Sequence, residues 1–182
     1  MHIGIFGGTF NPPHKGHKRM ALEMMKAASL DKILIIPTFT PPHKTAPDLA
    51  STKDRVEMCN LLFSEDCFEV SDIEIKREGK SYTVDTVSEL KKLYPEDELF
   101  LIIGSDMLLS FHKWYKFEDI ISGVTLSVAT RENDILPEVL SAYAKETLKL
   151  SESEYILSHM SPMECSSTEV REKVRNKDNL SE

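Results

Sequence analysis

The sequence predicts an α/β fold in which helices alternate with the strands of a parallel sheet. Short apolar runs rich in β-branched residues recur along the chain, and segments with apolar residues at helical spacing separate them. No internal repeat, low-complexity tract or linker divides the 182 residues. Because this alternation is typical of a parallel sheet with helices on both faces, we expect a single domain over 1–182. It would hold a Rossmann-like sheet of about five or six strands.

Five runs are predicted to be strands. Each is short and rich in β-branched apolar residues, as strands are. The runs are His2 to Phe6, Lys32 to Pro37, Phe68 to Ile75, Leu99 to Gly104 and Val124 to Thr130.

The segments between these runs predict the crossover helices. His17 to Ser29 and Thr83 to Tyr94 each place their apolar residues on one helical face. Thr38 to Thr52 instead contains three prolines and no periodicity, which indicates a long loop leading into a helix capped by Ser51 or Thr52. Loops of that length in compact domains are usually functional or mobile, and we expect this one to serve a site.

Composition limits the classes of function. The chain carries 22 basic and 30 acidic side chains, a net charge of −8, which argues against a broad nucleic-acid or anionic-membrane surface. Small anionic substrates fit only if basic residues gather in one cleft. Three cysteines without a C-x-x-C pair favour neither a disulfide framework nor a thiolate zinc site. With no basic leader and no long apolar run, we expect a cytoplasmic protein.

The densest motif follows the first predicted strand, in the string Gly7-Gly8-Thr9-Phe10-Asn11-Pro12-Pro13-His14-Lys15-Gly16-His17. A strand-to-helix turn in such a sheet binds anions, because free N–H groups and the positive end of the helix dipole meet there. The glycines let a phosphate approach the backbone, and two imidazoles three residues apart can hold one phosphoryl group. Surface histidines on a plain turn, or a metal pair, are the alternatives.

This string resembles the G-G-x-F-x-P-x-H-x-G-H signature of the HxGH nucleotidyltransferases, which transfer nucleotidyl groups from nucleoside triphosphates. Ser166-Ser167-Thr168-Glu169-Val170-Arg171 resembles the same superfamily's S-S-T-x-[IV]-R element. Ser167 or Thr168 can cap a helix that runs to about Asn176, and its N–H groups with Arg171 would form a pyrophosphate cradle. An ordinary capped surface helix is the alternative.

Four further segments resemble the nicotinate-nucleotide adenylyltransferase family. Pantetheine-phosphate adenylyltransferases and the glycerol-phosphate or choline-phosphate cytidylyltransferases share the first motif, but as families they lack the Pro-Pro-His-Lys and Ser-Tyr-Thr segments. In two places this chain departs from the family, with Cys165 before the serine pair and Glu164 for its usual Asp, and it ends where members usually add a short segment and a terminal helix. The four segments are Pro37 to Lys44, Ser81 to Thr86, Ile103 to Asp106 with Trp114 downstream, and Thr130-Arg131.

The resemblance implies transfer of AMP from ATP to nicotinate mononucleotide, with Mg²⁺ arriving on ATP and no dedicated metal site. It assigns catalysis to His14, His17, Lys44 and Arg171. Its ATP site comprises Gly7, Gly8, Phe10, Gly104, Asp106, Ser167, Thr168 and Arg171, and its mononucleotide site comprises Thr9, Lys44, Thr83, Trp114 and Arg131. No nucleic-acid polymer or membrane is an expected partner. A nucleotide-binding module without turnover, the choice between acid and amide mononucleotide, and homo-oligomer formation are left open.

Overall fold

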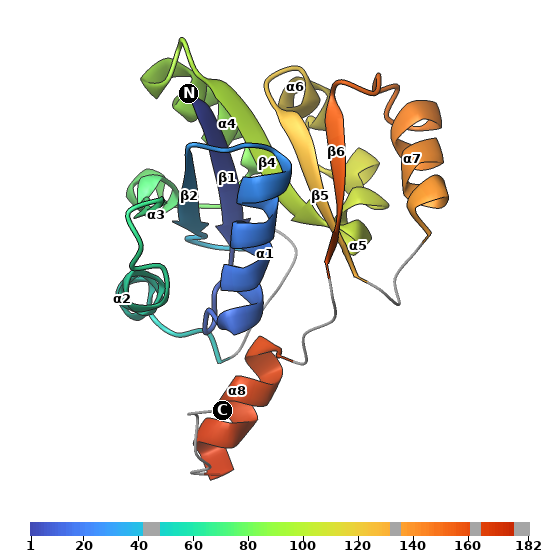
Figure 1. Cartoon of the computed structure of the whole chain (residues 1–182). Coiled ribbons are helices and arrows are strands. Elements are labelled where there is room, and N and C mark those ends of the chain that lie inside the picture. Colours follow the sequence, from blue (N-terminus) through green and yellow to red (C-terminus); the bar gives the residue numbers. More distant parts are fainter. Residues whose placement is uncertain (42–47, 132–135, 161–164, 177–182) are drawn as a thin grey trace.

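The structure, a computed structural model, describes residues 1–41, 48–131, 136–160 and 165–176. Within these ranges six strands form one parallel sheet in the order β3-β2-β1-β4-β5-β6 (Figure 1). The central strand β1 pairs Ile5 with Leu34 of β2 on one side and with Leu101 of β4 on the other. The strands are β1 (His2–Gly8), β2 (Lys32–Pro37), β3 (Phe68–Val70), β4 (Glu98–Gly104), β5 (Thr125–Arg131) and β6 (Tyr155–Met160).

Helices cover both faces of this sheet, as predicted. One face packs on α1 and α2, and the other on α4, α6 and α7. Figure 1 shows α8 apart from both layers, below the ends of the strands. The helices are α1 (Lys15–Ala27), α2 (Thr52–Leu62), α3 (Ile73–Arg77), α4 (Thr83–Leu93), α5 (Ser105–Leu108), the 3₁₀ turn η1 (Phe111–Lys113), α6 (Phe117–Ile121), α7 (Pro137–Glu146) and α8 (Ser167–Asn176).

The strand side chains explain the two layers. Ile3 and Ile5 of β1 join the core under α4 and α7, whereas Phe6 joins the core under α1 and α2. Successive side chains of a strand point to opposite faces, so a strand with no polar residue in its middle must be covered twice. The continuous apolar runs of β1, β2 and β4 are therefore the reason for helices on both sides.

The strand order also indicates where a ligand would bind. The chain runs outward through β2 and β3 on one side of β1, and through β4, β5 and β6 on the other. In open parallel sheets the crevice at such a reversal, outside the carboxyl ends of the strands, is where ligands bind. The turns after β1 and β4 meet at this crevice.

The prediction of a strand over Phe68 to Ile75 is wrong in its second half. β3 ends at Val70, and residues 73–77 form α3. Ile73 and Ile75 flank a polar residue with the spacing of a strand, but the side chain that α3 buries is the Glu74 between them. Helical periodicity does not show in five residues. The sequence also gave no prediction for α7 or β6.

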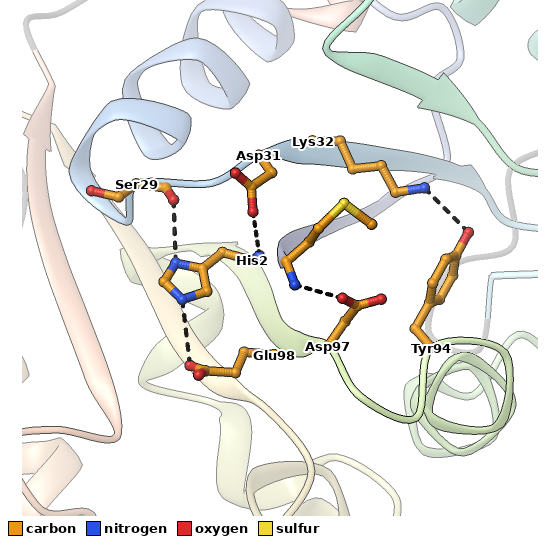
Figure 2. Close-up of polar contacts among 8 residues, drawn as sticks. His2, Ser29, Asp31, Lys32, Tyr94, Asp97 and Glu98 are labelled. Carbon is orange, nitrogen blue, oxygen red and sulfur yellow. Dashed lines mark hydrogen bonds and ion pairs between the residues drawn. The ribbon is translucent and has the colours of Figure 1, made fainter.

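Polar contacts join the residues at the amino-terminal ends of β1, β2 and β4 (Figure 2). The terminal amine of Met1 pairs with Asp97 at 2.5 Å, and the His2 amide donates to Asp31 Oδ2 at 2.7 Å. These contacts fix the start of β1 against its neighbours. Among the described residues no helix has the length and apolar character needed to cross a bilayer.

Candidate functional site

The turn after β1 is shaped by its two glycines and by Phe10. A Cβ on Gly7 would meet no atom within 4 Å, whereas one on Gly8 would lie 3.0 Å from the Phe10 ring. Phe10 is 2% exposed and has a positive φ of 47°, and its ring packs edge-on to Phe6 and Phe63. Gly7 thus presents bare backbone to the crevice, while Phe10 closes the turn from below.

His14 and His17 lie together at the start of α1. Their ring centroids are 3.8 Å apart, and the His14 amide donates to His17 Nδ1 at 3.2 Å. Because Nδ1 accepts that bond, the proton of the neutral ring resides on Nε2. Phe10 supports the His17 ring edge-on with centroids 5.1 Å apart. The first turn of α1 holds no acidic side chain, so the positive helix end is not opposed there.

The helix α8 is held to this turn by its side chains, since none of its residues is buried. Ser167 Oγ donates to the Pro12 carbonyl at 2.9 Å, and Arg171 Nη1 donates to the Asn11 carbonyl at 2.6 Å. The cap is Ser166, whose Oγ accepts the Glu169 amide at 3.2 Å. The prediction that Ser167 or Thr168 caps this helix is wrong by one residue, because the Ser167 hydroxyl is engaged with the turn instead.

These elements enclose the larger cleft, which has a volume of about 620 Å³. The turn after β1 forms one wall, α8 forms a second, and the end of β4 forms a third. Every residue predicted for ATP lies on it, together with Thr9 and His17. Those residues are Gly7, Gly8, Phe10, Gly104, Asp106, Ser167, Thr168 and Arg171.

The end of β4 contributes an acidic side chain to this cleft. Asp106 is exposed in the first turn of α5, and its Oδ1 lies only 2.7 Å from where a Cβ on Gly104 would stand. Gly104 is therefore needed for the carboxylate to fold back over the strand end. A carboxylate held there can accept hydrogen bonds from a pair of hydroxyl groups.

The smaller pocket adjoins the cleft and has a volume of about 180 Å³. Thr83 at the start of α4 and the half-buried Trp114 lie on its wall, as predicted for the mononucleotide. Phe111 stacks on Trp114 with ring centroids 4.7 Å apart and an interplanar angle of 31°. The apolar lining of the pocket includes Ile5, Ile36, Leu101, Ile102 and Ile103. A pocket with an apolar lining and an indole on its wall can take a flat aromatic ring.

The two hollows meet over the ends of β1 and β4. Both include Gly7, Gly8 and Thr9 on their walls. The cleft takes its aromatic wall, Phe6 and Phe10, from the core under α1, while Ile5 and Ile36 of the pocket belong to the core under α4. A ligand in each hollow would therefore face the other across the glycine turn.

Arg55 of α2 supports this arrangement and was not predicted. Its side chain is fully buried and donates to the carbonyls of Thr9 at 2.8 Å, Thr38 at 2.6 Å and Ala50 at 3.2 Å. Burial lowers the pKa of its guanidinium from the ordinary value. One cation thus fixes the turn after β1 to the segment after β2. Its only signal in the sequence is its spacing of four from the buried Cys59 on one helical face.

Two predicted site residues cannot be placed in this geometry. Lys44 lies outside the described residues, as does the side chain of Arg131, whose backbone ends β5. His14 touches His17 and is not among the residues that line the cleft. The structure thus brings together the remaining predicted residues in two adjoining hollows.

Comparisons with known proteins show the family to which the chain belongs. A family model described as cytidylyltransferase-like matches residues 5–173. The nicotinate-nucleotide adenylyltransferase of Bacillus subtilis (strain 168) is 50% identical over 66% of this chain and 64% of its own length. A protein of Shewanella baltica (strain OS223), named a probable nicotinate-nucleotide adenylyltransferase, is 40% identical over 96% of this chain and 88% of its own.

The fold is likewise shared with a solved structure. The Plasmodium falciparum nicotinic acid mononucleotide adenylyltransferase, solved with APC, superposes with a TM-score of 0.75 at 17% identity, covering 98% of this chain and 86% of that one. At that identity the likeness concerns the fold alone. The sequence relatives carry the assignment further. The chain belongs to the cytidylyltransferase-like family and, within it, to the nicotinate-nucleotide adenylyltransferases.

Proposed function

We propose that the two adjoining hollows are the two substrate sites of one adenylyl transfer. ATP occupies the larger cleft and nicotinate mononucleotide the smaller pocket. The 5′-phosphate of the mononucleotide attacks the α-phosphorus of ATP, a new P–O bond forms, and pyrophosphate leaves in line with its electron pair. The product is the dinucleotide intermediate of NAD biosynthesis, which is the reaction that the names of the sequence relatives describe.

The observation that carries this proposal is the shared wall of the two hollows. Gly7, Gly8 and Thr9 line both, so a phosphate from each side reaches the same exposed backbone. Holding two reactants in this relation supplies much of the barrier reduction in a displacement between phosphates. A pure nucleotide-binding module has no need for a second pocket on the other side of the turn.

The turn and α8 supply the groups that would stabilise charge. His17 Nε2 donates to the α-phosphate, and His14 keeps the His17 ring in the tautomer that donates. Arg171 and the amino end of α8 hold the leaving pyrophosphate. No general base is required, because the attacking phosphate is already largely ionised near neutral pH. Lys44 on the loop after β2 would add a further cation to the phosphates.

The mononucleotide would be recognised at the other end of the pocket. Trp114 stacks on the pyridine ring, and Thr83 with the free amide groups at the start of α4 receives the ring's carboxylate. Arg131 at the end of β5 would add positive charge at the same edge. Asp106 accepts from the ribose hydroxyls of ATP in the cleft.

Mg²⁺ enters this scheme on the triphosphate. The described residues contain no group of three or more His, Cys, Asp or Glu side chains placed to hold a metal ion. Mg²⁺ would bind mainly the phosphate oxygens of ATP, where it would neutralise charge on the leaving group. We expect excess EDTA to stop pyrophosphate release and added Mg²⁺ to restore it.

The test is pyrophosphate release by the purified protein with Mg-ATP and three acceptors in parallel. Nicotinate mononucleotide, nicotinamide mononucleotide and phosphopantetheine differ in the part that the smaller pocket would read. We expect release with nicotinate mononucleotide and none above background with phosphopantetheine. ATP binding without release for any acceptor would contradict the proposal and favour a module without turnover.

A further inference from the structure

A buried carboxylate forms part of the smaller pocket. Glu74 is 5% exposed, lines this pocket together with Thr83 and Trp114, and is the one buried side chain of α3. Its Oε1 accepts a hydrogen bond from Thr86 Oγ1 at 2.6 Å. Its Oε2 is buried and has no hydrogen-bond partner among the described residues. One oxygen of Glu74 is thus bound to α4, and the other has no hydrogen-bond partner among the described residues, in a side chain that lines the pocket.

The groups around Glu74 do not neutralise it directly. Arg77, also on α3, reaches Thr86 Oγ1 at 3.0 Å and pairs with Glu89 of α4 at 3.2 Å. The guanidinium is therefore separated from Glu74 by a hydroxyl and is shared with a second carboxylate. The Ser81 hydroxyl, which also acts on Glu74, is buried and accepts a hydrogen bond from the Phe39 amide at 2.9 Å.

Burial of Glu74 opposes its charged form. Burial raises the pKa of the Glu74 carboxyl above its usual range, and Glu89 adds to this, while Thr86, Ser81 and Arg77 oppose it. Because Oε1 accepts from Thr86, Oε2 is the oxygen that would carry the proton.

Under the proposed function this pocket receives a pyridine ring that bears a carboxylate. Two like charges in one small, largely apolar pocket repel, and the repulsion is relieved when one of them takes up a proton. The amide analogue carries no such charge. We propose that Glu74 is a specificity-determining residue, and that the acid mononucleotide binds to the form in which Glu74 Oε2 is protonated.

This inference rests on the proposed function and predicts a definite sign. Raising the pH ionises Glu74, so the preference for the acid over the amide mononucleotide falls with rising pH. A coupling of one pKa unit corresponds to a tenfold change in relative affinity. Both mononucleotides carry the same 5′-phosphate, so the titration of that phosphate cancels from their ratio.

The experiment measures this ratio for the wild type and for Glu74→Gln. Values of kcat/KM are taken for both mononucleotides, or the amide is measured as a competitive inhibitor, from about pH 5.5 to about pH 8.5. We expect the wild-type preference for the acid to fall by about tenfold across this range. Glu74→Gln keeps an oxygen for Thr86 but cannot ionise, so its preference stays constant and exceeds the wild-type value at high pH.

Glu89→Gln is the matched control. It removes a carboxylate from the same network, but Glu89 lines neither hollow, so the pH dependence of the ratio persists in this variant. A wild-type ratio that does not change with pH would overturn the inference. So would a Glu74→Gln variant that weakens both mononucleotides equally at every pH, because that result indicates a merely structural role.

A second measurement needs no variant. Calorimetric titration of the wild type in buffers of different ionisation enthalpy counts the protons taken up on binding. We expect more proton uptake with the acid mononucleotide than with the amide near neutral pH, and equal uptake would contradict the inference. Absence of pyrophosphate release with every acceptor would instead be a failure of the proposed function, so the two failures are distinguishable.

Discussion

Arg171 Nη1 donates to the carbonyl of Asn11 at 2.6 Å, joining residues 160 positions apart in the chain. The contact places the guanidinium on the cleft and fixes α8 to the turn after β1. Because α8 buries none of its residues, such side-chain contacts hold its described part. The same contacts therefore hold α8 in place and complete the wall of the cleft.

Replacing Arg171 by Met tests this role. We expect kcat/KM for ATP to fall by about 10²–10³, the scale of losing one oriented charge-stabilising donor. Arg175→Met is the control on the same helix, since its pair with Asp48 is exposed and exposed pairs contribute little. Steady-state kinetics of both variants settle the comparison, and equal losses would contradict a specific role for Arg171.

His17 is predicted to act through Nε2 alone. Its Nδ1 already accepts the His14 amide, and an Asn side chain can keep that bond while lacking the distal donor. We expect His17→Asn to lower turnover by about two to three orders of magnitude with the melting temperature nearly unchanged. His2 lies at the start of β1, at the other end of the strand from His17 (Figure 2), so we expect the His2→Asn variant to keep the wild-type turnover. Turnover of His17→Asn within a fewfold of wild type would refute the assignment.

Arg55 is predicted to matter chiefly for stability. Arg55→Met leaves the carbonyls of Thr9, Thr38 and Ala50 without their buried donor. We expect a loss of about 3 kcal/mol or more in the free energy of unfolding, measured in urea. Lys53→Met changes an exposed cation of the same helix and should change the free energy of unfolding by less than about 0.5 kcal/mol. A similar loss in both variants would contradict a specific stabilising role for Arg55.

Trp114 gives a direct signal for the smaller pocket. As the only tryptophan in the chain, it reports through its fluorescence on anything that stacks there. Nicotinate mononucleotide should change the emission, whereas ATP alone should leave it nearly constant. Trp114→Leu should raise KM for the mononucleotide by roughly twofold to tenfold, the scale of one aromatic pair. A change in emission caused by ATP alone would contradict a position of Trp114 in the mononucleotide pocket.

Cys59 is predicted to be chemically silent. It is fully buried on α2, and burial raises the pKa of its thiol to about 12. Because the thiolate is the reactive form, labelling of the native protein near pH 8 should spare Cys59 and occur at the half-buried Cys67 and Cys165. Peptide mass spectrometry after labelling reads this out. Early modification of Cys59 would show that α2 opens readily.

The sequence was sufficient for the sheet because its central strands are continuous apolar runs, which only a doubly covered sheet buries. Most of the residues predicted for the site line the two hollows, because both motifs lie where a strand ends or a helix begins. Phe68 to Ile75 was misread, since Ile73 and Ile75 alternate with polar residues as a strand does. A five-residue helix offers no period to detect.

The supporting residues could not be predicted for a different reason. Arg55 and Glu74 are charged residues that are buried, and in a sequence such residues are indistinguishable from the exposed ones. Their importance comes from what surrounds them in space, four carbonyls for Arg55 and a threonine hydroxyl for Glu74. The cap of α8 is a similar case, because Ser167 contacts Pro12, far away in the chain.

A crystal structure with the dinucleotide product bound tests most directly whether the cleft and the pocket are two halves of one active site. We expect the adenosine moiety in the cleft beside Asp106 and Arg171, the pyridine ring on Trp114, and the phosphates over Gly7 and Gly8. A dinucleotide bound with its adenine on Trp114, or lying wholly within one hollow, would show that the two hollows do not form one active site.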